Sequence, residues 1–156
     1  GKLFYTQERV GKNGQVFNIM KFRTMVKNAE KGGAVFATSN DTRITPFGKI
    51  LRKSRIDEFP QFINILKGDM AVIGPRPERP IFVKEIAEVM PFYETRHVIK
   101  PGLTGWAQVN YSYGETIDDS LIKLQYDLYY IKHRSLFLDF NIIFKTLSTI
   151  LFYRGQ

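Results

Sequence analysis

Two adjacent carboxylates, Asp57 and Glu58, lie in a stretch whose residue types suit phosphoryl chemistry. The stretch, residues 52–70, reads RKSRIDEFPQFINILKGDM, with basic residues before the pair and an apolar run after it. An aspartate can attack phosphorus and form an acyl phosphate, and a neighbouring glutamate can hold Mg²⁺, which prefers oxygen ligands. Arginine and lysine side chains neutralise the charge of phosphate oxygens. The pattern predicts a phosphoryl-transfer site, with a capped helix and surface ion pairs as the alternative reading.

The composition agrees with a globular protein that meets an anionic partner. The chain has 156 residues, 44% of them hydrophobic and 24% charged, and a formal net charge of +8. That length suits one domain, residues 1–156, with its own core. The positive charge favours nucleic acid, a phosphorylated substrate or an acidic membrane surface as partner. Cysteine is absent, which excludes disulfides and thiolate metal sites.

A helix start is expected at the carboxylate pair. Proline is tolerated in the first turn of a helix, where the backbone N–H groups have no internal partner. If Asp57 is the N-cap, Pro60 falls within that turn, and Gly68 ends the helix. Apolar residues follow at helical spacing: Phe59, Phe62, Ile63 and Leu66. The macrodipole at such a helix start favours negative charge, including a bound phosphate.

The other predicted elements make a mostly helical α+β domain with a small N-terminal β-hairpin. The hairpin joins strands at 3–10 and 16–20 through Asn13-Gly14, a strong turn signal. Thr45-Pro46 predicts an N-cap followed by proline at the first helical position. Further helices are expected at 81–89, from Ile117 onward, and in the amphipathic stretch 135–153, which is packed or lies at a membrane interface. Glycines and prolines predict loops at 28–43 and 100–115.

Three long motifs in fixed order carry a resemblance to a known family. They cover nearly the whole chain and read QERVGKNGQVFNIMKFRTM, TRITPFGKILRKSRIDEFPQFINILKGDMAVIGPRP and KPGLTGWAQVN. The chain thereby resembles the bacterial sugar transferases, the monotopic polyprenyl-phosphate phosphoglycosyl transferases that begin exopolysaccharide, capsule and O-antigen assembly. GPRPERP together with YDLYYIKHRS is most similar to the larger exopolysaccharide-type members.

The resemblance implies a reaction and a role for each carboxylate. A sugar phosphate passes from a nucleotide sugar, usually a UDP-sugar, to a polyprenyl phosphate such as undecaprenyl phosphate, and UMP is released. Asp57 matches the nucleophile that takes the phospho-sugar covalently, and Glu58 matches a ligand of Mg²⁺. Family members normally begin with a membrane helix that this chain lacks. We therefore expect the catalytic part of a longer protein, placed at the cytoplasmic face of the bacterial inner membrane.

Two sets of basic residues are predicted to contact phosphate or lipid. The set for the substrate phosphates lies after the second predicted strand and in the loop GPRPERP: Lys21, Arg23, Arg76 and Arg79. Strand alternation puts the first two on one face, and prolines on both sides of Arg76 lower the entropic cost of positioning it. The set for an anionic membrane surface precedes the carboxylate pair: Lys49, Arg52, Lys53 and Arg55. A solvated basic face is the alternative for this second set.

Two rival functions remain at this point. A basic chain with 14% aromatic residues could bind nucleic acid through charge and stacking, but no recognisable nucleic-acid motif is present, so we expect no nucleic-acid partner. An inactive scaffold of a polysaccharide assembly complex is disfavoured because both carboxylates are intact.

Overall fold

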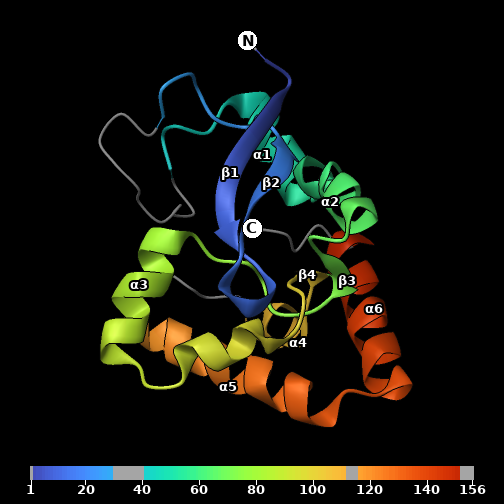
Figure 1. Cartoon of the computed structure of the whole chain (residues 1–156). Coiled ribbons are helices and arrows are strands. Elements are labelled where there is room, and N and C mark those ends of the chain that lie inside the picture. Colours follow the sequence, from blue (N-terminus) through green and yellow to red (C-terminus); the bar gives the residue numbers. More distant parts are fainter. Residues whose placement is uncertain (1, 30–40, 112–115, 152–156) are drawn as a thin grey trace.

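The computed structural model describes residues 2–29, 41–111 and 116–151, and places a long hairpin against a set of helices (Figure 1). The strands are β1 (Phe4–Val10), β2 (Val16–Phe22), β3 (Ala71–Ile73) and β4 (Gly102–Thr104). The α-helices are α1 (Pro46–Lys53), α2 (Gln61–Lys67), α3 (Pro80–Val89), α4 (Trp106–Asn110), α5 (Ile117–His133) and α6 (Leu136–Leu151). Single 3₁₀ segments are η1 (Lys12–Gly14), η2 (Ile56–Glu58) and η3 (Tyr93–Val98). The α+β prediction is confirmed.

The predicted N-terminal hairpin is also confirmed. β1 and β2 pair antiparallel in a register that runs from Phe4 opposite Phe22 to Val10 opposite Val16. Asn13 and Gly14 both adopt positive φ, 55° and 77°, which is the backbone that an Asn-Gly hairpin turn requires. β2 extends two residues beyond the prediction, so that Lys21 belongs to the strand.

The prediction of a loop without regular elements at 100–115 is wrong for residues 102–110. β4 pairs parallel with β3, and α4 follows directly. The glycines there serve close backbone packing: a Cβ on Gly102 would come within 2.1 Å of the Gly74 nitrogen, and a Cβ on Gly105 within 2.2 Å of the Gly74 oxygen. Residues 112–115 lie outside the described part, as do residues 30–40 of the loop predicted at 28–43.

The predicted helices form, and their caps explain where two of them begin. Thr45 accepts a hydrogen bond from the Gly48 N–H with Pro46 at the first position of α1. Thr116 and Asp119 make a reciprocal capping box at the start of α5. No helix within the described ranges is both long and apolar enough to cross a membrane.

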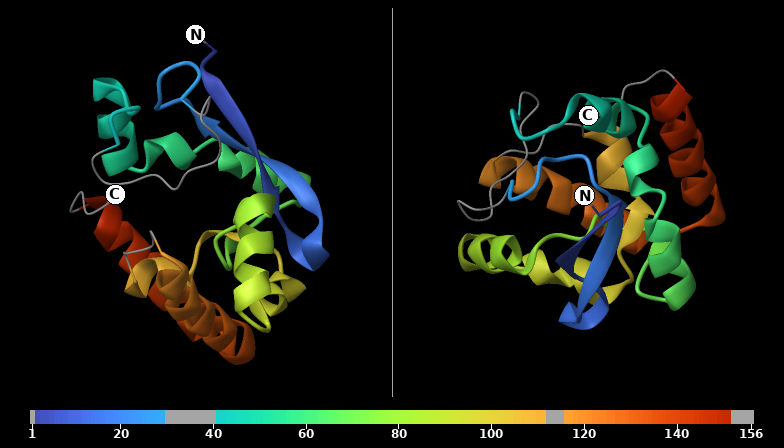
Figure 2. Two further views of the ribbon diagram at one scale, coloured as in Figure 1. Left: turned by 90° about the vertical axis from the view of Figure 1, so that its left-hand side faces the viewer. Right: turned by 90° about the horizontal axis from the view of Figure 1, so that it is seen from above.

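Two apolar clusters hold the domain together. The first joins the end of β1 to α3, η3 and α5, through Val10, Phe82, Val83, Ile86, Met90, Tyr93 and Leu124. The second joins α5 to α6 through Tyr130, Leu138 and Ile142, with Ile73, Ile99, Trp106 and Val109 packed against it. The views of Figure 2 show the hairpin lying between α3 on one side and α1 and α2 on the other. This arrangement leaves the α1–α2 corner, which contains the carboxylate pair, beside the edge of β2.

Candidate functional site

Asp57 and Glu58 lie in a 3₁₀ turn rather than at the start of an α-helix. The expectation that Asp57 caps the helix is wrong: Pro60 is the N-cap residue of α2, and η2 precedes it. Arg55 adopts the left-handed conformation (φ 56°, ψ 15°), which ends α1 and turns the chain before the helix can restart. As a result both carboxylates are buried, each 8% exposed.

The Glu58 carboxylate is surrounded by cations from three parts of the chain. Its Oε1 accepts hydrogen bonds from Lys21 Nζ at 3.0 Å and from Arg76 Nη2 at 2.9 Å. Its Oε2 lies 3.8 Å from Arg55 Nη1. Burial opposes the charge on Glu58, but Arg76, Lys21 and Arg55 outweigh it and hold the pKa of Glu58 well below its usual range. Glu58 is therefore an ionised carboxylate fixed in place.

Asp57 has a different environment although it is the adjacent residue. Among the described residues, no side chain donates a hydrogen bond to its carboxylate. Burial, and then the negative charge of Glu58, raises the pKa of Asp57, while Lys21, Arg52 and Arg76 act in the opposite direction. A carboxylate that lacks strong hydrogen bonds and is partly desolvated is more basic, which suits a nucleophile.

Buried Asn64 of α2 places Lys21 beside Glu58. Its side-chain oxygen accepts from the Met20 N–H at 3.0 Å, and its side-chain nitrogen donates to the Asn18 carbonyl at 2.8 Å. The two bonds continue the hydrogen-bonding edge of β2 onto α2. Because Lys21 follows Met20 in the strand, the same bonds set the position of the lysine relative to the 3₁₀ turn.

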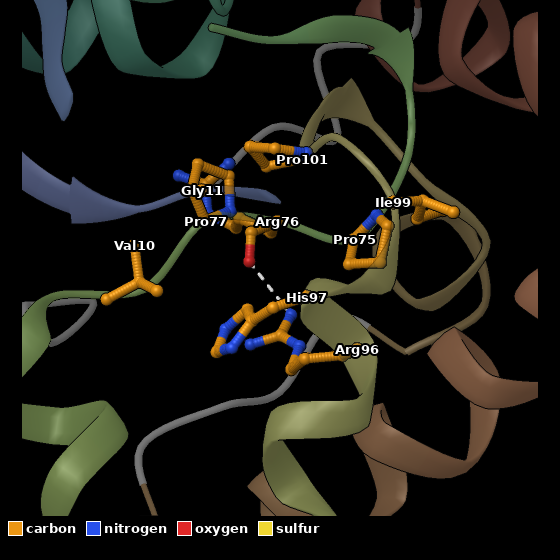
Figure 3. Close-up of a pocket in the computed structure, with 9 residues that line it drawn as sticks. All are labelled: Val10, Gly11, Pro75, Arg76, Pro77, Arg96, His97, Ile99 and Pro101. Atoms are coloured by element: carbon orange, nitrogen blue, oxygen red, sulfur yellow. Dashed lines mark hydrogen bonds between the residues drawn. The ribbon is translucent and has the colours of Figure 1, made fainter. Parts of the chain in front are cut away.

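Arg76 reaches Glu58 from a loop with no regular structure of its own. The loop follows β3, and backbone contact between Gly74 and the segment around β4 fixes its start: Gly74 N–H donates to the Thr104 carbonyl at 2.9 Å. Pro75 and Pro77 are buried on either side of Arg76. Figure 3 shows this loop lying against Arg96 and His97. The pocket that these residues line has about 0 Å³ of space for water.

The other predicted basic residues divide into two that lie near the carboxylates and four for which no contact with them is described. Arg52 points inward, with Nε donating to the Thr24 hydroxyl at 3.0 Å, so that Arg52 and Arg55 lie near the carboxylates. Lys49 and Lys53 are exposed on α1. Arg79 lies over the Phe82 ring, 5.6 Å from its centroid, and Arg23 follows the end of β2.

Three residues that the sequence reading did not select support the site: Asn64, Arg96 and Asp127. Arg96 and Asp127 form a buried ion pair of 2.7 Å. Asn64 had one visible signal, since it is the lone polar side chain within the apolar run FINIL. His97, which the sequence gave no catalytic role, is buried, and burial followed by the charge of Arg96 lowers its pKa to about 4. It is thus neutral.

The carboxylates suit a divalent cation only in partnership with a substrate. In the part of the chain that the structure describes, no three His, Cys, Asp or Glu side chains form a metal-binding group. Asp57 and Glu58 can supply one or two hard oxygen ligands. Mg²⁺ is usually held by one or two carboxylates while substrate phosphates and water complete its octahedron. The residues present fit that mode.

Comparisons with known proteins identify the family of the chain. The sequence model described as "Bacterial sugar transferase" matches residues 1–153. The chain is 52% identical, over 97% of its length, to the UDP-N-acetylgalactosamine-undecaprenyl-phosphate N-acetylgalactosaminephosphotransferase of Aeromonas hydrophila, of which it covers 36%. It is 44% identical, over 97% of its length, to the UDP-glucose:undecaprenyl-phosphate glucose-1-phosphate transferase of Xanthomonas campestris pv. campestris, and 39% identical, over 94%, to the Escherichia coli (strain K12) protein of that name, covering 32% of each. The chain thus spans about a third of the length of these relatives.

Proposed function

The chain belongs to the bacterial sugar transferase family, and from that premise we propose that it transfers a sugar phosphate from a UDP-sugar to polyprenyl phosphate through Asp57. The observation that carries the proposal is the contrast within the pair: Glu58 is fixed by Lys21 and Arg76, while the neighbouring Asp57 is free of hydrogen bonds from the described side chains. One carboxylate is therefore available to react, and the other organises the charges around it.

The proposed reaction consists of two displacements at one phosphorus. An Asp57 oxygen attacks the phosphorus that carries the sugar, and the bond from that phosphorus to the bridging oxygen of the diphosphate breaks. UMP leaves with the bridging oxygen and the bonding electrons, and the sugar phosphate remains on Asp57 as an acyl phosphate. An oxygen of polyprenyl phosphate then attacks the same phosphorus. The Asp57 carboxylate is released, and the product is a polyprenyl-diphosphate-sugar.

The basic residues around the pair supply the charge that this step needs. Lys21, Arg52, Arg55 and Arg76 face the two carboxylates, so positive charge is in excess by two. Charge builds on the non-bridging oxygens and on the leaving phosphate in the transition state, and preorganised cations stabilise it there. Arg76 and Arg55 present guanidinium groups, which can bond phosphate oxygens in pairs.

Mg²⁺ would be held by Glu58, with Asp57 beside it, and would neutralise the donor diphosphate when bound. Both Glu58 oxygens face cations in this structure. Binding of the metal with the diphosphate would therefore exchange partners, since Lys21 and Arg76 can turn from Glu58 to the phosphate oxygens that arrive with it.

A half-reaction with the donor alone tests this function. The protein is incubated with Mg²⁺ and a panel of UDP-sugars. We expect release of UMP from at least one sugar and a phospho-sugar adduct on the peptide that contains Asp57, detected by mass spectrometry. Asp57→Asn keeps the size of the side chain and should lose both signals while the fold is retained. UMP release by the Asp57→Asn variant would refute the role of Asp57 as nucleophile.

The acceptor gives a physical reason for the site to lie at a membrane surface. Drawing a polyprenyl chain into water costs about 0.8 kcal/mol per CH₂ exposed, so the carboxylates must lie at headgroup depth. Large apolar side chains are exposed on the elements that flank them: Phe47, Ile50, Phe59, Phe62, Ile63 and Leu66. Lys49 and Lys53 are exposed on the same corner. We propose that the α1–α2 corner is the face that meets an anionic bilayer.

Vesicle flotation tests the membrane face. The protein should float with anionic vesicles at low salt, be released at high salt, and bind neutral vesicles poorly, because each lysine near an anionic surface contributes about 1 kcal/mol and salt screens it. Lys49→Glu with Lys53→Glu should abolish flotation. Lys84→Glu with Lys132→Glu is the matched control, since it changes the net charge equally and both lysines are exposed, Lys84 on α3, across the hairpin from α1 (Figure 2), and Lys132 on α5. Equal loss in both variants would place the membrane contact elsewhere.

A further inference from the structure

The loop that presents Arg76 is held by its carbonyl groups. Prolines at 75 and 77 have no N–H to donate, and the loop forms no ladder of its own. Instead, each of four successive carbonyls accepts a hydrogen bond from a different donor. Pro75 accepts from Gly102 N at 2.9 Å, Arg76 from Arg96 Nη2 at 2.8 Å, Pro77 from Arg9 Nη1 at 3.0 Å and Glu78 from Val10 N at 2.9 Å. The donor to Arg76 itself is thus the buried side chain of Arg96 (Figure 3).

Arg96 has little freedom to point elsewhere. Its side chain is 5% exposed and pairs with Asp127 of α5, which is 2% exposed, at 2.7 Å. Its Nη1 donates to the Tyr93 hydroxyl at 2.8 Å, and its guanidinium carbon lies 5.2 Å from the centre of the Tyr93 ring. Burial opposes the charge on Arg96, but Asp127 outweighs it and the pKa of Arg96 is raised. The guanidinium fork is therefore charged and fixed in direction.

The contacts run without interruption from α5 to the carboxylate pair. Asp127 orients Arg96, Arg96 bonds the main-chain oxygen of Arg76, and the Arg76 side chain bonds Glu58 at 2.9 Å. Fold stability alone is a weak reason for such a pair, because replacing a buried ion pair by apolar residues of similar volume is often neutral or stabilising. The pair supplies something that apolar residues cannot, which is a donor for the Arg76 carbonyl.

We propose that Arg96 and Asp127 are positioning residues for phospho-sugar transfer, acting through the main chain of Arg76. The proposal rests on the proposed function for the reaction itself. Among the described residues, the polar partners of Arg96 are Tyr93, Asp127 and the Arg76 carbonyl, not Glu58. Together Arg96 and Asp127 fix the origin of the Arg76 side chain, and so the direction from which its guanidinium meets Glu58 and a phosphate oxygen. Misplacing such a group by about 1 Å can cost about 100-fold in rate.

The test replaces the pair by apolar residues and measures two independent quantities. In the double variant Arg96→Met, Asp127→Leu the core stays filled and no charge is left unpaired, so unfolding should remain cooperative. We expect kcat for UMP release to fall about 10-fold to 100-fold, with KM for the UDP-sugar changed much less, because Arg76 is present but misdirected. In ¹⁵N spectra of the unsubstituted protein, the Arg76 guanidinium held by Glu58 should show slowed rotation. In the double variant this rotation should be fast.

Two further variants keep the outcome decisive. Arg96→Lys retains the charge beside Asp127 but lacks the planar fork that reaches the Arg76 carbonyl as well. It should show the same loss of kcat and of slowed Arg76 rotation, and it replaces the double variant in the test if that variant does not fold. Tyr130→Phe is the control: it removes a partly buried hydrogen bond of 2.8 Å to Asp139 between α5 and α6 and should leave kcat unchanged.

Unchanged kcat and unchanged Arg76 resonances in the folded variants would overturn the positioning role and leave the proposed function standing. If the unsubstituted protein released no UMP from any donor, the proposed function would fail, and the Arg76 resonances would still decide the positioning role.

Discussion

The Glu58 cluster and the Arg96–Asp127 pair are both built from buried charges, yet they differ in balance. Glu58 faces three cations within 3.8 Å, and the further carboxylate of Asp57 leaves positive charge in excess. Asp127 has one ion-pair partner among the described residues, Arg96, and the two side chains are 2% and 5% exposed. An unbalanced cluster can receive an anion, whereas a balanced pair sealed from solvent can only support its neighbours. Charge balance thus distinguishes the candidate site from the buried pair that supports it.

The acidic residues of the two clusters also differ in the backbone that carries them. Asp127 lies within the 17-residue helix α5, where its position is set by regular packing. Glu58 lies in a single 3₁₀ turn that follows the left-handed residue Arg55. Left-handed conformations in residues other than glycine cost about 1 kcal/mol. The same combination occurs before Arg96, which lies in η3 after the left-handed residue Phe92 (φ 65°, ψ 9°). Of the three charged residues compared, Asp127 alone is carried by regular helix.

Among the substitutions in these two clusters, replacement of Glu58 at the centre of the unbalanced cluster should reduce activity most. Glu58→Gln leaves Lys21 and Arg76 without their ionised partner and removes the proposed metal ligand. We expect UMP release to fall at least about 100-fold and the free energy of unfolding to fall by about 2 kcal/mol, which is less than for a fully buried pair because Arg76 is partly exposed. Steady-state assays at varied Mg²⁺ and thermal unfolding measure the two effects.

Glu78→Gln is the matched control for that variant. Glu78 also pairs with an arginine, Arg9, at 3.4 Å, but its carboxylate does not face Asp57. Its loss should lower the free energy of unfolding by no more than Glu58→Gln does, and should leave the Mg²⁺ dependence of UMP release unchanged. Full activity of Glu58→Gln in excess EDTA would show that neither the metal nor the carboxylate has the role assigned to it.

The sequence predicted those parts of the fold and site that depend on short-range signals. Asn13-Gly14 marked the hairpin and Thr45-Pro46 marked α1, because turn and cap chemistry is local. The 3₁₀ turn at Asp57 was missed because no glycine marks the left-handed Arg55. The pairing of β4 with β3 was missed because glycines at 102 and 105 look like breaks, whereas they permit contact with Gly74. Arg96 and Asp127 lie 31 positions apart, and only the packed fold brings them together.

Substitution of Arg55 should have the smallest effects, but it discriminates best between strain and charge. This one residue carries both the left-handed strain and part of the charge excess. Arg55→Gly relieves the left-handed conformation at φ 56°, and we expect the melting temperature to rise by about 2 °C. The same change removes a cation 3.8 Å from Glu58, so UMP release should fall by about 3-fold to 10-fold. Arg55→Lys keeps both the charge and the strain and should resemble the unsubstituted protein in both assays. Opposite changes in stability and rate would show that the strained turn is retained for the charge that it places beside the carboxylates, whereas a drop in both would mean that Arg55 stabilises the fold through its contact with Glu58.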